Sequence, residues 1–492
     1  MKAKIHVAVA CSLLFLARGT EPAGPERSPT EPAGVTITVK PQPRQTFGGF
    51  GASCYGGADY LQLAPERRAK LNALVWRQAR FNTMRIWLRL KAYAPAPGDR
   101  RFMAAFSDGD AVLVRDAQAA GVRHLVLGPA DVPAYLIARS PTIGHDGNGR
   151  SIEPYPKPGQ FDAHAAIIAD FIFELREKEH ITVEATGIQN EPNDPNDCVY
   201  TPEDVVRSVK ALRAALDSRG LRQVKIIAPE SVGCNAPAYA QVEALKADKT
   251  AWSALGGLAS HDYDGGATER WADAIAGSGK EYWMTEFCIG GPEDPGDCLR
   301  GAAEACAFLS DMNHRVNYWI HFIGYLSNDP HDNGTRLIAY YNGNVAGKSW
   351  LKVFEPYCYL KQISQTFDAG AVFRRSVGPR EDKMTWTHDH KPPLVVAAAR
   401  NPDGSWAIGI SDYTSNDFPP HFWHPGKPAQ GFTVTVRVEE LARAGELRFE
   451  TRSIGPQFKN SRQRPVTVMR HGQLTVTVTP LELVTLRSLP TG

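Results

Sequence analysis

Eight short apolar segments alternate with amphipathic segments between residues 47 and 324. The apolar segments have the composition of buried strands, and the segments between them have the apolar spacing of helices. The expected strands are FGGFGAS from Phe47, then 82–88, 123–129, 183–191, 224–230, 257–263, 281–287 and 317–324. Because strands that alternate with helices form parallel βα units, eight such units predict a closed (β/α)8 TIM barrel, an α/β fold.

The pattern changes after the barrel. A last helix is expected around 348–367, and beyond it short strands are separated by turn residues, which predicts an antiparallel β-sandwich over 367–492. Val35 to Lys40 alternates and is β-branched, so we expect 35–45 to be an N-terminal strand that packs with this sandwich. The catalytic barrel would then span 46–366.

The N-terminus has the composition of an export signal. Lys2 and Lys4 precede an apolar stretch at 5–17, and small residues flank position 19, which predicts a signal peptide at 1–19. Residues 20–34 are rich in Pro, Glu and Gly and are expected to form a flexible leader. We therefore expect a secreted or periplasmic protein with no membrane span.

Seven of the eight cysteines lie beyond the expected signal peptide. In an oxidising compartment some of them should pair, and the odd number leaves at least one as a thiol. The candidate disulfide bonds are Cys198–Cys234, which follow two expected strands, and Cys288–Cys298, which bracket a loop rich in Pro and Gly.

Charge and motifs exclude several function classes. The net charge is +2, from 55 Lys and Arg against 53 Asp and Glu, and no basic stripe with interleaved aromatics is present, so nucleic acid is not an expected partner. The chain has no CxxC or HExxH spacing, so we expect no metal. We expect no organic cofactor either, and a monomer.

Two glutamates end expected strands. Glu191 lies in IQNEP, where Pro192 stops the strand, and Glu286 lies in WMTEF. In a (β/α)8 barrel the C-terminal ends of the strands carry the chemistry, and two carboxylates are the minimum equipment for glycoside hydrolysis. Taken alone, Glu191 could equally be a solvated loop carboxylate.

Four segments resemble glycoside hydrolase family 30, the retaining clan A barrels with a side β-sandwich. They are FGGFGAS, IQNEP, WMTEF and YCYLKQISQTFDAGA. The resemblance implies that Glu191 is the general acid/base and Glu286 the nucleophile of a double displacement through a covalent glycosyl-enzyme. Many family members have Ser-Pro-Trp after the third strand, whereas this chain has Gly128-Pro129-Ala130, which leaves the bound sugar open.

Other residues near strand ends are candidates for the same site. Arg85 and Tyr263 are expected to hold the ionised Glu286, and Asn190 to bind the sugar 2-hydroxyl, while the charge of Glu286 should raise the pKa of Glu191. The candidate substrate-binding residues are Asn190, Arg85, Tyr263, His261 and Trp319. Alternatives stay open, because Arg85 could be a structural ion-pair residue, Tyr263 and His261 satisfied core polar groups, and Trp319 a core aromatic. Trp87 is a second candidate platform for a sugar, and Glu230 is a third acid at a strand end, either a bystander or a substrate ligand.

These inferences together predict a secreted retaining β-glycoside hydrolase. Its partner would be a β-linked oligo- or polysaccharide, either a glucan, galactan or xylan or else a glucosyl conjugate. Two alternatives are a catalytically inactive carbohydrate-binding barrel and a transglycosylase that uses the same residues.

Overall fold

The computed structural model describes residues 32–137, 159–194, 199–265, 268–289, 298–327, 335–341, 349–379, 385–418 and 426–490. The expected signal peptide, most of the expected leader and Cys198 lie outside these residues.

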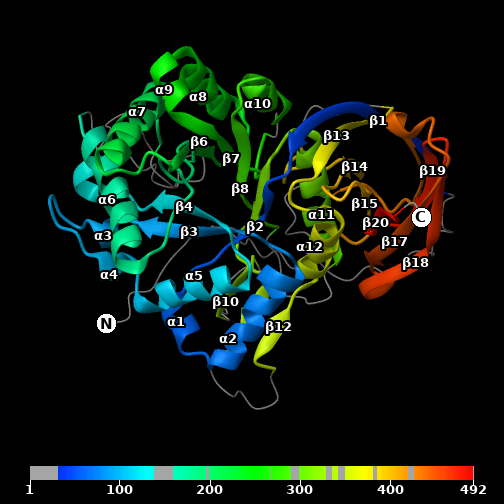
Figure 1. The fold of residues 1–492 in the computed structure, drawn as a ribbon, viewed down its shortest axis with the longest axis horizontal. Coiled ribbons are helices and arrows are strands. Elements are labelled where there is room, and N and C mark those ends of the chain that lie inside the picture. Colours follow the sequence, from blue (N-terminus) through cyan, green and yellow to red (C-terminus); the bar gives the residue numbers. More distant parts are fainter. Residues whose placement is uncertain are drawn as a thin grey trace, which may run out of the picture. The chain divides into compact units, whose positions relative to one another are not determined.

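A closed barrel of eight parallel strands forms the first part of the fold, as predicted (Figure 1). Most residues of its strands are buried, because helices cover the outside and side chains fill the inside. The strands are β2 (Gly49–Ser53), β3 (Thr83–Arg89), β4 (His124–Ala130), β5 (Ala185–Thr186), β6 (Lys225–Ser231), β7 (Leu255–His261), β8 (Glu281–Phe287) and β9 (Tyr318–His321).

Helices connect the barrel strands, and their starts follow from local sequence. Ser107 and Thr201 each form a capping box with an aspartate three residues later, so a helix begins directly after each of them. The longer helices are α2 (Pro65–Asn72), α5 (Asp108–Ala120), α6 (Phe161–Glu179), α7 (Pro202–Ser218), α8 (Ala236–Ala247), α10 (Thr268–Ile275), α11 (Cys298–Asn313) and α12 (Glu355–Thr366). Shorter ones are α1 (Gly57–Leu61), α3 (Leu90–Tyr93), α4 (Phe102–Ala105) and α9 (Lys249–Ala254), and a π-helical turn at Ala73–Gln78 extends α2.

Two segments differ from expectation. The strand expected at 183–191 pairs only at Ala185–Thr186, since the backbone then leaves the regular ladder and reaches Pro129 and Glu230 through single hydrogen bonds. The helix expected from 348 begins only at Glu355, with Pro356 at its first turn. A small sheet precedes it, made of β10 (Tyr325–Ser327), β11 (Ile338–Tyr340) and β12 (Leu351–Val353).

The C-terminal strands form a second, separate β structure of nine strands, which we call the β-domain. Its order is β1-β13-β14-β15-β20-β17-β18-β19-β16. The bounds are β1 (Ala33–Thr46), β13 (Val372–Val377), β14 (Leu394–Arg400), β15 (Trp406–Asp412), β16 (Phe432–Val438), β17 (Glu446–Gly455), β18 (Phe458–Arg470), β19 (Gln473–Val478) and β20 (Leu483–Ser488).

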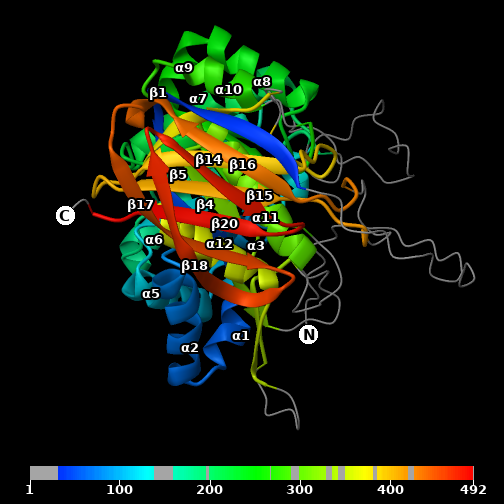
Figure 2. The same cartoon turned by 90° about the vertical axis from the view of Figure 1, so that its right-hand side faces the viewer.

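The N-terminal strand β1 completes the β-domain, as predicted. It pairs antiparallel with β13 and parallel with β16, so the domain is mixed rather than wholly antiparallel. Figure 2 shows β1 lying along β16. The strand begins at Ala33, inside the range expected for the leader, because Ala33 and Gly34 pair with Phe432 and Thr433.

Helices α11 and α12 join the barrel to the β-domain. Asn313 on α11 donates to the carbonyl of Val396 across 2.7 Å. Tyr359 on α12 donates to the carbonyl of Leu481 across 2.7 Å. Both helices therefore hydrogen-bond to the β-domain. Among the described helices, none combines the length and apolar character needed to cross a bilayer.

The structure contains no disulfide bond between the cysteines that it describes, so the expected Cys288–Cys298 pair is wrong. Cys234 is a buried thiol as well, which removes the expected Cys198–Cys234 pair. Its sulfur lies 3.4 Å from Ser260 Oγ and 3.0 Å from Tyr282 Oη, so the thiol has polar partners in the core. Cys288 lies 3.7 Å from the hydroxyl of Tyr263.

Candidate active site

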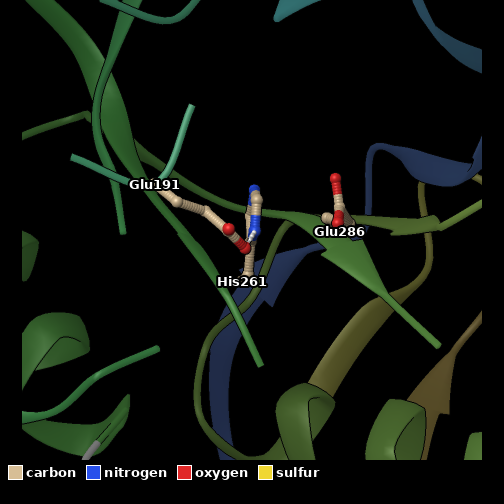
Figure 3. A group of neighbouring side chains, drawn as sticks. All are labelled: Glu191, His261 and Glu286. Atoms are coloured by element: carbon tan, nitrogen blue, oxygen red, sulfur yellow. Dashed lines mark hydrogen bonds and ion pairs between the residues drawn. The ribbon is translucent and has the colours of Figure 1, made fainter. Parts of the chain in front are cut away.

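The two glutamates singled out by the sequence meet at the C-terminal end of the barrel. One carboxylate oxygen from each of Glu191 and Glu286 and one ring nitrogen of His261 all lie within 4.8 Å of one another. Figure 3 shows the imidazole of His261 between the two carboxylates. A separation of about 5 Å between two carboxyl groups is that of retaining glycosidases.

Glu286 is held by two donors. Arg85 Nη1 donates to its Oε2 across 2.6 Å, and the hydroxyl of Tyr263 donates to its Oε1 across 3.0 Å. Its side chain is 8% exposed. Both carboxylate oxygens are therefore fixed in direction, and one of the two bonds is charge-assisted.

Arg85 connects Glu286 to the rest of the site. Its Nη2 donates to Asn190 Oδ1 across 2.9 Å and lies 3.5 Å from Glu230 Oε1, and its guanidinium lies 4.2 Å from the ring centre of Trp87. Burial opposes the charge on Arg85, but the carboxylates of Glu230 and Glu286 outweigh it and raise the pKa. Arg85 thus stays a buried cation.

Two glycines make room for this ion network. A Cβ at Gly128 would lie 2.9 Å from Arg85 Nη2, and one at Gly187 would lie 2.0 Å from Glu230 Oε2. A side chain at position 128 would therefore crowd the guanidinium of Arg85 in its present position.

Glu191 has an unusual backbone and an unusual acidity. Its φ is 46°, and its N–H donates to the carbonyl of Glu230 across 3.0 Å. Burial, followed by the charge of Asp194, raises the pKa of Glu191 to about 8 against an opposing effect of Arg85. The expected direction is therefore found, but its largest causes are burial and Asp194 rather than the charge of Glu286.

His261 contacts Glu191 as a neutral ring. Its Nδ1 lies 2.7 Å from Glu191 Oε1, and burial lowers the pKa of the imidazole to about 4. Its Nε2 is buried and has no hydrogen-bond partner within the described residues. The ring thus orients Glu191 without placing a positive charge beside it, and it leaves one polar atom inside the site.

The same three side chains form the one group of His, Cys, Asp and Glu within the described residues that is compact enough to hold a metal ion. The hydrogen-bond donors around these side chains disfavour a bound metal ion. Both oxygens of Glu286 accept hydrogen bonds from Arg85 and Tyr263, and a buried guanidinium next to a cation site is unfavourable. The donor set therefore suits a pair of carboxyl groups better than a cation.

Trp319 lies elsewhere, although the sequence made it a candidate sugar platform. Its side chain has no exposed surface, its Nε1 donates to Asp311 on α11 across 2.9 Å, and its ring contacts Phe50 and Phe308. It faces the helix layer, because its neighbours Tyr318 and Ile320 fill the barrel interior. The structure therefore places Trp319 as a core aromatic residue and not as a sugar platform. Trp87, in contrast, lies against Arg85 at the site.

One residue of the β-domain reaches the site, and sequence reasoning missed it. His388, in the connection from β13 to β14, donates its backbone N–H to the carbonyl of Tyr263 across 3.3 Å, and its Nε2 lies 3.0 Å from the carbonyl oxygen of Cys288. The sequence gives no local signal for this contact, because it joins segments about a hundred residues apart.

Solved structures with this architecture include glycoside hydrolases of low sequence identity. The catalytic domain of the family 30 xylanase C from Talaromyces cellulolyticus has a TM-score of 0.66 and 16% identity, over 92% of this chain and 100% of that one. SrfJ from Salmonella typhimurium has a TM-score of 0.66 and 16% identity, over 95% of each chain. The endo-beta1,6-glucanase BT3312 has a TM-score of 0.63 and 17% identity, over 92% of this chain and 95% of that one.

No family model and no curated protein matches the sequence. The likeness therefore shows a fold, that of the family 30 glycoside hydrolases, over nearly the whole chain.

Proposed function

We propose that the chain, which has the fold of the family 30 glycoside hydrolases, is itself a retaining hydrolase of β-linked glycans. The single observation that carries this proposal is the pair Glu191 and Glu286. Their oxygens lie within 4.8 Å, and their surroundings differ in the way that an acid and a nucleophile require. Two donors hold the carboxylate of Glu286, while the pKa of Glu191 is raised to about 8.

The first step is attack and protonation. A carboxylate oxygen of Glu286 bonds to the anomeric carbon while Glu191 gives its proton to the leaving glycosidic oxygen, so that the alcohol departs and a covalent glycosyl-enzyme remains. Arg85 and Tyr263 hold Glu286 in the direction of attack. Asn190, oriented by Arg85, would contact the sugar 2-hydroxyl.

The second step reverses the roles. Glu191, now ionised, takes a proton from water as the water attacks the anomeric carbon, and the bond to Glu286 breaks. The product keeps the anomeric configuration of the substrate. Glu191 is thereby reprotonated, and the cycle closes without any cofactor in these steps.

The fold relatives and the N-terminus support a substrate class. The similar structures include xylanases and an endo-β-1,6-glucanase, and the expected signal peptide at 1–19 supports action outside the cytoplasm. We therefore propose an exported enzyme that acts on a β-glucan, a β-xylan or a related β-linked glycan.

The test is hydrolysis of a panel of aryl β-glycosides and β-glycans by the wild type and by Glu286→Gln and Glu191→Gln. Glu286→Gln should lose at least about 1,000-fold in kcat on all substrates. Glu191→Gln should lose less on an activated aryl glycoside, because a good leaving group needs little protonation. Glu281→Gln, at the other end of β8, is the matched control and should retain activity. Absence of turnover on the whole panel would contradict the proposal.

A further inference from the structure

A short segment of the β-domain is built into the catalytic end of the barrel. It runs from Thr385 to His388 in the connection between β13 and β14, and its first three residues are fully buried. Trp386 contacts Phe287, the residue after Glu286, with ring centres 6.1 Å apart. Connections between strands normally run over the protein surface. The burial of this one indicates that it has a structural role at the catalytic end of the barrel.

The contacts of this segment fall on the two strand ends that hold the candidate nucleophile. The N–H of His388 donates to the carbonyl of Tyr263, just beyond β7, and its ring Nε2 lies 3.0 Å from the carbonyl oxygen of Cys288, just beyond β8. The centre of the imidazole ring lies 5.3 Å from the ring centre of Tyr263 and 5.8 Å from the ring centre of Phe287. One histidine thus ties together the strand end that carries Glu286 and the strand end that carries its phenol donor.

The start of the segment is anchored on α11 and lies beside the end of β7. Thr385 Oγ1 donates to Asp311 Oδ1 on α11 across 2.5 Å and lies 3.5 Å from Asp262 Oδ2. Asp262 is the residue between His261 and Tyr263. The N–H of Trp386 donates to Ser310 Oγ across 3.0 Å. The segment is therefore fixed on α11 before it reaches the site.

We propose that the segment Thr385–His388 positions the catalytic centre, and that His388 is a positioning residue that acts through Tyr263 and the end of β8. This inference rests on the proposed function. It gives the β-domain a part in catalysis, because the ring of Tyr263, whose hydroxyl donates to Glu286, packs against the imidazole of His388.

The protonation of His388 agrees with this role. Burial lowers the pKa of its imidazole to about 4, so the ring is neutral at ordinary pH. A neutral imidazole has one N–H, and an Nε2–H facing the carbonyl of Cys288 is a donor. Of the charged groups that follow it in the chain, Lys391 lowers and Asp389 raises the pKa of the imidazole, and from the barrel it faces the ring of Tyr263 and the carbonyl of Cys288.

The kinetic test uses two substitutions at the same position. Gln can place an amide N–H near the position of Nε2, whereas Phe keeps a ring but has no donor. We expect His388→Phe to lower kcat on an activated aryl glycoside about 10- to 100-fold with KM changed less than about 3-fold. His388→Gln should recover most of the loss. His164→Phe, at a buried histidine of α6, is a control for the loss of any buried imidazole.

A double-mutant cycle then asks whether His388 acts through Tyr263. If it does, His388→Phe combined with Tyr263→Phe should lose little more than Tyr263→Phe alone. Fully additive losses would overturn the inference.

A measurement without substrate separates this inference from the proposed function. Hydrogen exchange should quicken at the amides of Tyr263 and Ile289 in His388→Phe and stay at the wild-type rate in His388→Gln, since both amides lie at the strand ends that His388 ties together. Unchanged exchange in His388→Phe would overturn the positioning role even in an active enzyme. If the wild type cleaves no glycoside, the proposed function fails, and the exchange result alone then decides whether His388 fixes these strand ends.

Discussion

Arg85 Nη1 lies 2.6 Å from Glu286 Oε2, in a contact that joins strands on different sides of the barrel, β3 and β8. The same guanidinium also contacts Asn190 and Glu230. One buried cation thus sets the position of the candidate nucleophile, of the amide next to the candidate acid, and of a third carboxylate.

Arg85→Lys tests this shared role. Lysine keeps the charge but cannot form the planar fork that reaches three partners. We expect kcat to fall about 100-fold, with a smaller loss of stability than in Arg85→Met. Arg85→Met leaves two buried carboxylates without a cation and should lower the free energy of unfolding by about 3–5 kcal/mol. Steady-state kinetics and urea unfolding measure the two effects. Wild-type kcat in Arg85→Lys would refute the role of the fork.

Tyr263→Phe tests the second donor to Glu286. The phenol hydroxyl lies 3.0 Å from Oε1, and its loss should lower kcat about 10- to 100-fold. Tyr282→Phe is the matched control, because that buried hydroxyl contacts Ser260 and Cys234 rather than a carboxylate of the site. Equal losses of kcat in both variants would mean that the effect is one of general stability.

The pH dependence of activity follows from Glu191. Because the acid must be protonated and its pKa is raised to about 8, activity on a substrate with a poor leaving group should fall as the pH rises through about 8. Asp194→Asn removes a negative charge that favours the protonated form, so the alkaline limb should move to lower pH by about 0.5–1 unit. A limb that stays in place or moves to higher pH would show that Asp194 does not act on Glu191. An activated aryl glycoside serves as the control.

The buried pair Asp262 and Asp311 predicts a pH-dependent stability. Burial raises the pKa of both carboxyl groups, that of Asp311 from 3.8 to about 7. The folded state therefore holds protons that the unfolded state releases, so the contribution to stability is full below about pH 4 and is lost as the pH rises through about 7. Asp262→Asn keeps a donor towards Asp311 and needs no proton.

The free energy of unfolding should therefore fall less steeply with pH in Asp262→Asn than in the wild type. The difference between pH 5 and pH 8 should be on the order of 1–3 kcal/mol. Denaturant unfolding at several pH values measures it. Parallel pH curves for the two proteins would show that the pair does not hold the extra proton.

The barrel, and the position of the two glutamates at its C-terminal end, could be predicted because their signals are local. The alternation of strand and helix patterns can be followed in consecutive residues, and Pro192 shows that no strand continues past Glu191, although β5 itself ends at Thr186. The parallel pairing of β1 with β16 joins Val35 to Val434 and has no such signal.

The direction of side chains and the contacts between distant segments are harder to predict from the sequence. Trp319 and Tyr318 are adjacent on one strand but face the helices and the barrel interior respectively, a choice that depends on the register of β9. The expected disulfide bonds rest on positions along the chain, which do not fix the distance between two Cβ atoms. His388 reaches the site only because the β-domain packs against α11.

The most direct test of the central claim is covalent trapping of the nucleophile. An activated 2-deoxy-2-fluoro β-glycoside of the preferred sugar should form a stable glycosyl-enzyme, which intact mass spectrometry detects as one added glycosyl group. Peptide mapping should place the label on Glu286, and Glu286→Gln should take up none. A label on any other residue, or a hydrolysis product of inverted configuration, would contradict the assignment of Glu286 and Glu191.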